Sequence, residues 1–420
     1  MFVYLINILS ICLYALFFCR GRNAELKISK ILFLVLAFTQ CAVISIMRSN
    51  IGTDYVMYFN GFKEMAQSGF SNMKHEDWEI GYILLNKIIG IFTDRAAVLF
   101  AVTTIISLAG PFYLILRYSK NYFMSVFLFL NTYLFYLTMN YIRQGIAMSI
   151  MCFAYGFMKN CDLGNGKKLW KDKNMWLFLL LVAVAATFHL PVVYMIPVFF
   201  ISFIKLNWKT LPIYAVGLIV YFATSDFILD KLLSHFHQEY ADSRFINNGI
   251  AFYYAIIPLI ICVAMIALAF LLKFKLSRSL NLLIHLTLMM GFWQIVMTKH
   301  ALFERFSYYT MIYLIIAVPE AIYAFKEKLI ERSQNADTEN SSDLHESKKI
   351  KPKKHAHLAE CSVEKKSNRI VVAVSSAVLV LMFAYNMLGL IVPKYGAHGV
   401  LPYKSIYNLS IPDIDGWFKR

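Results

Sequence analysis

Charged residues are scarce in this 420-residue chain, and it has no motif for nucleotide or zinc-protease chemistry. Only 16% of the residues are charged, whereas 59% are hydrophobic, a balance too apolar for a soluble protein to cover with polar surface. No phosphate-binding loop, dinucleotide fingerprint or HExxH motif occurs, which argues against soluble nucleotide chemistry. We therefore expect a membrane protein that has no ATPase domain to drive transport.

Cysteine and signal-peptide patterns are also missing. The seven cysteines form no CxxC motif and no disulfide framework, so they predict no metal site. The histidines His355 and His357 lie in a basic polar run, where solvated side chains are the commoner explanation. The N-terminal stretch 1–18 lacks both a basic start and a small-residue cleavage site, and we expect it to be retained as a span.

About twelve apolar stretches approach the length of a membrane span. They cover residues 2–18, 28–47, 96–116, 122–138, 141–158, 175–188, 190–204, 211–223, 251–272, 280–298, 306–325 and 370–392. A further stretch, 80–92, is too short to span and is expected to lie in the interface or to re-enter. The predicted fold class is an all-α polytopic integral membrane protein.

Three regions follow from this division. Residues 1–329 form the membrane domain, which includes the long loop 48–95. Residues 330–369 are polar and basic and cannot bury a core, so we expect a flexible cytoplasmic loop. Residues 370–420 hold the last span and an extracytoplasmic tail.

The distribution of lysine and arginine predicts the orientation. The segment after the first stretch carries Arg20, Arg22, Lys27 and Lys30, and the later loops of the same parity are basic as well. The loop 48–95 instead has more acidic than basic residues, so we expect it to be extracytoplasmic. The net charge of +16 is then mostly topological, and it gives no support to nucleic-acid binding.

A sparse group of polar and charged residues falls at span ends or in loops on the predicted outer face: Arg48, Asp54, Glu79, Arg143, His189, Arg244 and Arg305. Arg143, followed by Gln144, lies in the first turn of a predicted span, where the helix dipole disfavours a cation. Free backbone N–H groups beside a guanidinium there suit a phosphate. Arg305 repeats the arrangement at the start of stretch 306–325.

Structural explanations compete with functional ones at several of these positions. Arg48 would anchor the negative end of a helix, and Thr53 or Asp54 would cap the next one. Glu304 beside Arg305 partly explains that arginine by charge. His189, at the tip of a hairpin of two short apolar stretches, would satisfy free backbone groups near a proline, although ionisable groups in spans are rare without a role.

Five short motifs follow one another along this face. They are Arg48…Gly52-Thr53-Asp54…Tyr58, Trp78-Glu79-Ile80-Gly81-Tyr82…Asn86, Arg143-Gln144-Gly145-Ile146-Ala147, Phe188-His189 and Glu304-Arg305-Phe306…Tyr309. In this order, and over about residues 1–325, they resemble the EpsG family, relatives of the Wzy polysaccharide polymerases.

The resemblance implies a GT-C-like glycosyltransferase of the hexosyltransferase type. It would join oligosaccharide repeat units carried on undecaprenyl pyrophosphate into an O-antigen, a capsule or an exopolysaccharide, at the outer face of the bacterial cytoplasmic membrane. The donor is already activated, so we expect no metal and no other cofactor. Its partners would be the lipid-linked oligosaccharide, membrane lipid, a chain-length regulator and a flippase, and no nucleic acid.

Candidate roles follow from charge. Arg143 and Arg305 would stabilise the leaving pyrophosphate, with Arg48 or Arg244 assisting. Asp54, Glu79 or His189 would take the proton of the acceptor hydroxyl, and the ordinary pKa of histidine, about 6.5, suits that role. The predicted catalytic residues are Asp54, Arg143, His189 and Arg305, and the predicted substrate contacts are Arg48, Thr53, Tyr55, Tyr58, Glu79, Gln144 and Arg244.

The aromatic side chains of the outer loop have two explanations. Tyr55, Tyr58, Trp78 and Tyr82 could stack on sugar rings, although aromatic belts at membrane interfaces are the commoner explanation.

Three other functions stay open. A lipid-linked oligosaccharide flippase would line a central cavity with charges at mid-bilayer depth, which this chain mostly lacks. A membrane O-acyltransferase would need a cytoplasmic route for its acyl donor, and the outer arginines would then be surplus. An O-antigen ligase shares donor and membrane face with a polymerase, and the sequence separates the two poorly.

The predicted orientation can be tested by cysteine labelling in intact cells, in a variant whose seven native cysteines have been replaced. We expect Asn60→Cys and His235→Cys to react with an impermeant thiol reagent added outside, because both positions fall in outer segments. Asn165→Cys and His345→Cys should react only after the cells are opened. Labelling of position 345 in intact cells would show that the orientation is wrong.

Overall fold

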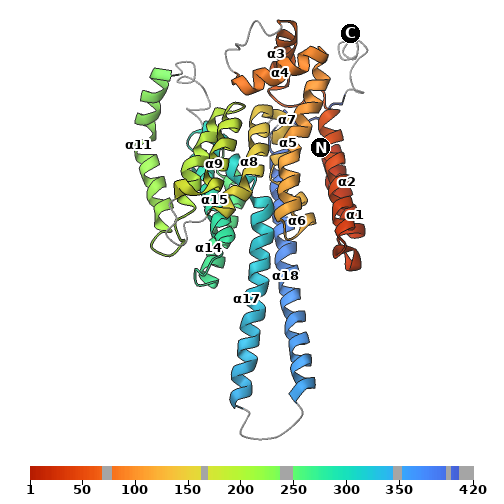
Figure 1. The fold of residues 1–420 in the computed structure, drawn as a ribbon, viewed down its shortest axis with the longest axis vertical. Coiled ribbons are helices and arrows are strands. Elements are labelled where there is room, and N and C mark those ends of the chain that lie inside the picture. Colours follow the sequence, from red (N-terminus) through yellow and green to blue (C-terminus); the bar gives the residue numbers. More distant parts are fainter. Residues whose placement is uncertain (69–77, 162–168, 237–248, 344–351, 394–398, 406–420) are drawn as a thin grey trace.

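The computed structural model describes all residues except 69–77, 162–168, 237–248, 344–351, 394–398 and 406–420, and its regular elements are helices (Figure 1). The α-helices are α1 (Phe2–Phe18), α2 (Lys27–Ile46), α3 (Tyr55–Gln67), α4 (Ile80–Phe92), α5 (Ala96–Tyr118), α6 (Tyr122–Asn131), α7 (Leu134–Asn140), α8 (Ile142–Asn160), α9 (Lys173–Ala186), α10 (Met195–Ile201), α11 (Pro212–Phe236), α14 (Tyr253–Leu271), α15 (Arg278–Val296), α16 (Glu304–Met311), α17 (Leu314–Asp343) and α18 (Pro352–Ile391). Short 3₁₀ helices are η1 (Gly21–Ala24), η4 (Leu169–Lys171), η5 (Leu190–Tyr194) and η6 (Ala301–Phe303).

Each stretch predicted to span the membrane is mainly helical, but fewer helices are long enough to cross it. In the described part of the chain, five are sufficiently long and apolar: α2, α5, α14, α15 and residues 367–391 of α18. Two bent helix pairs, α6–α7 and α16–α17, raise the number to seven if each pair is one span. The other apolar helices are shorter. The chain is therefore a polytopic helical protein. The predicted number of twelve spans and the predicted GT-C-like fold remain predictions.

Helix also occupies most of the segment predicted to be a flexible loop. α17 continues to Asp343, and α18 begins at Pro352. The segment is rich in glutamate and lysine, which favour helix, and a proline is well suited to the first helical position. Both helices project beyond the rest of the molecule, at the end opposite α3 and α4 (Figure 1). The projecting helices and the α3–α4 cap thus lie at opposite ends, as the predicted orientation requires. The side of the membrane on which each end lies remains a prediction.

The predicted outer loop forms a cap of two helices, α3 and α4, with a small aromatic core of its own. Tyr58, Trp78 and Tyr82 pack edge to face or at a tilt, with ring centres 4.9–6.0 Å apart. Gly61 allows this packing, because a Cβ there would lie 2.2 Å from the Trp78 ring. The buried Lys87 amine donates to the Met65 carbonyl at 2.9 Å, where the negative end of α3 favours a cation.

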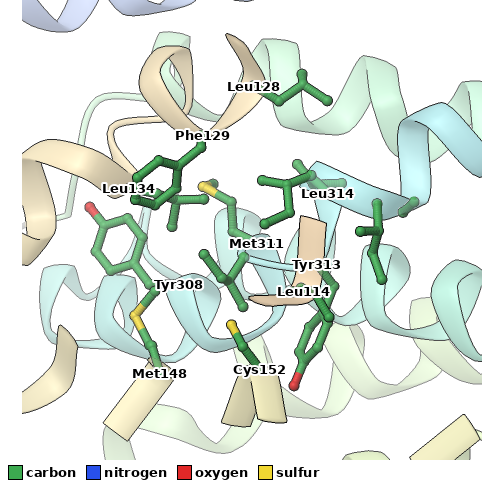
Figure 2. Close-up of a cluster of buried hydrophobic side chains, with 14 of the residues drawn as sticks. Leu114, Leu128, Phe129, Leu134, Met148, Cys152, Tyr308, Met311, Tyr313 and Leu314 are labelled. Atoms are coloured by element: carbon green, nitrogen blue, oxygen red, sulfur yellow. The ribbon is translucent and has the colours of Figure 1, made fainter. Parts of the chain in front are cut away.

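Two bent helix pairs meet in the main core. Each pair bends by 52°, and Tyr133 in the first break has a left-handed backbone, with φ of 62°. Figure 2 shows Phe129 and Leu134 from one pair close to Met311 and Leu314 from the other. Irregular backbone inside a membrane is tolerated where protein surrounds it, and this apolar cluster supplies that cover.

Side-chain hydroxyls accompany the two breaks. The Thr132 hydroxyl donates to the Leu128 carbonyl at 2.8 Å, and the Thr310 hydroxyl donates to the Ser307 carbonyl at 3.0 Å. The Ser125 hydroxyl donates to the Ile315 carbonyl and so joins α6 to α17. The Ile315 carbonyl has no helical N–H partner because Pro319 lies four residues later, so the Ser125 hydroxyl satisfies it, while the two threonine bonds add to the backbone bonds of their helices. The bends also set the ends of α7 and α16 beside the start of α8.

Candidate functional site

The Glu79 carboxylate connects three elements at the end of the molecule that carries the α3–α4 cap. One oxygen forms a 2.5 Å salt bridge with Arg143 Nη1, in the first turn of α8. The other accepts the Leu190 N–H at 3.1 Å, where η5 begins. The side chains of Arg143 and Glu79 are only 16% and 21% exposed, so water screens the pair weakly.

A backbone contact reinforces this connection. The Gly81 N–H donates to the Thr187 carbonyl at 2.7 Å. A Cβ on Gly81 would lie 2.3 Å from the Thr187 hydroxyl, so only glycine allows this approach without a shift. The cap, the start of α8 and the α9–η5 turn are thereby held together.

Arg143 has a charge partner within the protein. The sequence suggested that a cation at the start of α8 requires an anion, and Glu79 supplies one. The Tyr58 hydroxyl also interacts with the guanidinium. Glu79 therefore positions Arg143, and a structural explanation for this arginine gains weight beside the functional one.

Arg305 lies in the first turn of α16. Its guanidinium is centred 5.1 Å from the ring of Tyr141, and its backbone carbonyl accepts the Gln144 side-chain N–H at 2.6 Å. Among the described residues, no acidic side chain forms a salt bridge with Arg305. The neighbouring Glu304 carboxylate instead accepts the Tyr308 hydroxyl. The predicted charge compensation of Arg305 by Glu304 is not formed as a salt bridge.

His189 is buried between the two arginines. Its Nδ1 lies 2.7 Å from the Tyr309 hydroxyl, and its residue surface is 6% exposed. Burial first, and then the charges of Arg305 and Arg143, lower the pKa of His189 to about 3. The imidazole is therefore neutral near pH 7. Its predicted advantage as a base is lost, and a hydrogen-bonding role at the site remains.

Asp54 belongs to a tight turn seated on the end of α7. The Asn140 side-chain oxygen accepts the Asp54 N–H at 3.0 Å, and the Thr53 hydroxyl donates to the Asp54 carboxylate at 2.9 Å. Gly52 has φ of 94°, and a Cβ there would lie 2.7 Å from the Asn140 oxygen. Asp54 stands at the N-cap position of α3 but makes no side-chain cap bond, so capping does not occupy its carboxylate.

Arg48 is separated from solvent. It is 0% exposed, its Nη1 donates to the carbonyl and hydroxyl of Ser45, and its guanidinium is centred 5.0 Å from the Phe100 ring. Ser45 lies in the last turn of α2. These contacts favour the alternative in which Arg48 anchors a helix end, and they leave it no direct route to a substrate.

The predicted aromatic substrate contacts are used within the cap. Tyr55 stacks on Phe100 at 4.6 Å between ring centres, and Tyr58, Trp78 and Tyr82 cover one another. All four are at most 6% exposed. They form the core of the α3–α4 cap, so neither sugar stacking nor an interfacial belt describes them. The predicted contact Arg244 lies outside the described residues.

Three residues of the site were not predicted. Asn140 holds the Gly52–Asp54 turn, Tyr141 lies under Arg305, and Tyr309 contacts His189. Asn140 and Tyr141 directly precede the Arg143 motif, and Tyr309 lies one helical turn after Arg305. Tyr309 ends the fifth motif, but no role was predicted for it; its spacing of four residues from Arg305 indicates the same face of the helix.

The described part of the chain contains no set of side chains arranged to bind a metal ion. No group of three or more histidine, cysteine, aspartate or glutamate side chains lies together there. The expectation of a metal-independent reaction stays a prediction.

Comparison with known proteins identifies one family. The family model described as EpsG family matches residues 30–333, which is well over half of the chain. The match confirms the resemblance inferred from the five motifs. No curated protein matches the chain, and no solved structure does.

His189 predicts a pH-dependent stability. The folded pKa of about 3 lies below the unfolded value, about 6.5, so below about pH 6.5 the unfolded chain binds a proton that the folded chain does not. Folding stability should therefore fall as the pH falls, by roughly 2 kcal/mol between about pH 7.5 and about pH 5. Thermal unfolding of detergent-purified protein measures this loss. His189→Gln should lose less stability over the same range, and equal losses in both proteins would contradict the assignment.

Proposed function

The chain belongs to the EpsG family, and we propose that it is a polymerase of surface polysaccharide that joins undecaprenyl-pyrophosphate-linked oligosaccharide repeat units at the outer face of the cytoplasmic membrane. Family membership supports a polysaccharide-polymerase-like function. The observation that carries the finer proposal is the gathering of Arg143 and Arg305 around the buried, neutral His189. Gln144, next to Arg143, donates to the Arg305 carbonyl at 2.6 Å, and Glu79 is the acid salt-bridged to Arg143.

This charge distribution suits a lipid pyrophosphate. Of the two guanidinium groups, only that of Arg143 has a described salt-bridge partner. Both arginines lie in first helical turns, where backbone N–H groups also favour anions. A partly dry site strengthens such attraction. Glu79 keeps Arg143 oriented, and Arg305 provides the charge that no described salt bridge neutralises.

The reaction needs one bond exchange and one proton transfer. The acceptor hydroxyl oxygen attacks the anomeric carbon of the donor sugar, and a new glycosidic bond forms. The bond from that carbon to the phosphate oxygen breaks, and its electron pair leaves with the undecaprenyl pyrophosphate. Arg143 and Arg305 stabilise the charge on this leaving group. The hydroxyl proton passes to a carboxylate.

Asp54 is the better candidate for that carboxylate. Glu79 already accepts from Arg143 and from the Leu190 N–H, and both bonds weaken it as a base. Asp54 holds a single described side-chain bond, from Thr53, and its charge acts on Tyr58 and Tyr141, which also neighbour Arg143 and Arg305. Asn140 fixes the backbone of this turn and so positions the carboxylate.

Purified protein supplied with a synthetic lipid-linked repeat unit should convert it into a ladder of lipid-linked oligomers. A flippase or an acyltransferase would produce no ladder. An O-antigen ligase would likewise leave single units unpolymerised in this assay. In cells, deletion of a ligase would cause long lipid-linked chains to accumulate, whereas deletion of a polymerase would leave single units. Absence of oligomers from well-folded protein with an authentic unit would overturn the proposal.

In the same assay, Arg143→Ala and Arg305→Ala should each abolish oligomer formation. Lysine should restore little of it, because it lacks the bidentate guanidinium fork. Arg95→Ala is the matched control, since Arg95 precedes α5, outside this group, and should keep full activity. Membrane insertion and a single elution peak establish that each variant folds. Normal oligomer length in both arginine variants would remove the phosphate-site assignment.

Asp54→Asn should lower turnover by about 10²-fold or more, because the amide cannot take the acceptor proton. His189→Gln should lower turnover much less, since a neutral imidazole is not the base. Single-turnover rates at saturating donor separate this effect from donor binding. Unchanged turnover in Asp54→Asn, with a loss confined to donor affinity, would transfer the role of base to Glu79.

A further inference from the structure

An apolar groove of about 570 Å³ lies between α14, α17 and α18. Every side chain that lines it is apolar. α14 and residues 367–391 of α18 are candidate spans, and α17 belongs to a bent pair that passes the same test. Two residues that line it, Ile260 of α14 and Leu381 of α18, are 45% and 39% exposed. The groove therefore opens to the surface that these candidate spans present to lipid.

The groove is long and narrow. On α14 it extends from Ile257 to Leu271, which corresponds to about 21 Å along a helix and covers much of a hydrocarbon layer about 30 Å thick. Small side chains border it, among them Ala264, Ala321 and Ala377. Alanine at a helix contact usually allows close approach of two backbones, but here it borders open volume. The shape suits a long, slender apolar chain.

One end of the groove adjoins the candidate site. Ile257 lies one turn after Tyr254 on α14, and Met382 lies one turn before Tyr385 on α18. Both tyrosines lie within electrostatic range of Glu304, the residue that precedes Arg305. An apolar chain in the groove would thus end toward the start of α16, the helix whose first turn carries Arg305.

We propose that this groove binds the polyisoprenoid tail of the lipid-linked donor and thereby presents its pyrophosphate to Arg305 and Arg143. The inference rests on the proposed function and names the part of the chain that selects the carrier lipid. The two arginines favour the pyrophosphate carrier over an ordinary phospholipid, because a pyrophosphate offers more negative charge and more acceptor oxygens to two guanidinium groups than a phosphodiester does.

The test fills the groove. Ala321→Trp and Ala377→Trp should obstruct it, whereas Val263→Trp and Val380→Trp place the same side chain on outward-facing positions of α14 and α18. Native mass spectrometry with undecaprenyl phosphate, which carries no sugar, should show at least about tenfold weaker binding in the first pair only, the loss expected when about 1.4 kcal/mol of contact is removed. In the polymerisation assay, the KM for the full-length donor should rise without a matching fall in kcat. A donor with a ten-carbon isoprenoid should be used equally well by all variants.

Photo-crosslinking keeps the proposal testable if a tryptophan variant does not fold. A benzophenone amino acid at position 321 should crosslink undecaprenyl phosphate in otherwise unaltered protein, and the same group at position 263 should crosslink it far less. Equal crosslinking at both positions, or displacement of the carrier by equimolar phosphatidylglycerol, would overturn the assignment. If the protein forms no oligomers but Ala321→Trp and Ala377→Trp still weaken carrier binding, the groove assignment stands and only the polymerase activity is rejected.

Discussion

The partly buried salt bridge between Glu79 and Arg143 is the interaction on which the arrangement of the site depends. It joins the α3–α4 cap to α8, and the second oxygen of Glu79 joins both to the α9–η5 turn that carries His189. Breaking such a pair leaves an uncompensated buried charge, which is strongly destabilising. The same carboxylate that orients Arg143 therefore also determines where His189 lies relative to the arginines.

Charge at the site is unevenly compensated. Glu79 is matched by Arg143, while Arg305 rests on the Tyr141 ring and meets no described salt-bridge partner. His189 remains neutral because burial and both arginines oppose its protonation. A neutral imidazole bonded to Tyr309 adds no further positive charge, so the positive charge of the site resides on the two guanidinium groups. Such a site attracts an anion strongly only when the anion can reach it from the membrane surface, which is where a lipid pyrophosphate is found.

The bent helix pairs explain how helical elements build a site of this kind. Regular spans would carry α7 and α16 directly past the start of α8. Instead, the breaks at Tyr133 and Tyr313 turn them, and the buried cluster in Figure 2 covers the irregular backbone. Asn140 at the end of α7 and Arg305 at the start of α16 then flank Arg143. Packing encloses the irregular backbone, and the Ser125 hydroxyl bonds the Ile315 carbonyl, which Pro319 leaves without a helical N–H partner.

Hydropathy, charge distribution and motif order by themselves determined that this is a polytopic helical membrane protein of the EpsG family, and they identified Asp54, Glu79, Arg143, His189 and Arg305 as one group. These properties are local, because apolar length and helix-end charge can be read from neighbouring residues. Only the tertiary structure decided that Arg48 is enclosed at a helix end, that the cap aromatics cover one another, and that His189 is held neutral. Those outcomes depend on contacts between distant segments, such as Glu79 with Arg143, 64 positions apart, and His189 with Tyr309, 120 positions apart. Burial by distant segments sets exposure and pKa, and no local pattern of residues encodes it.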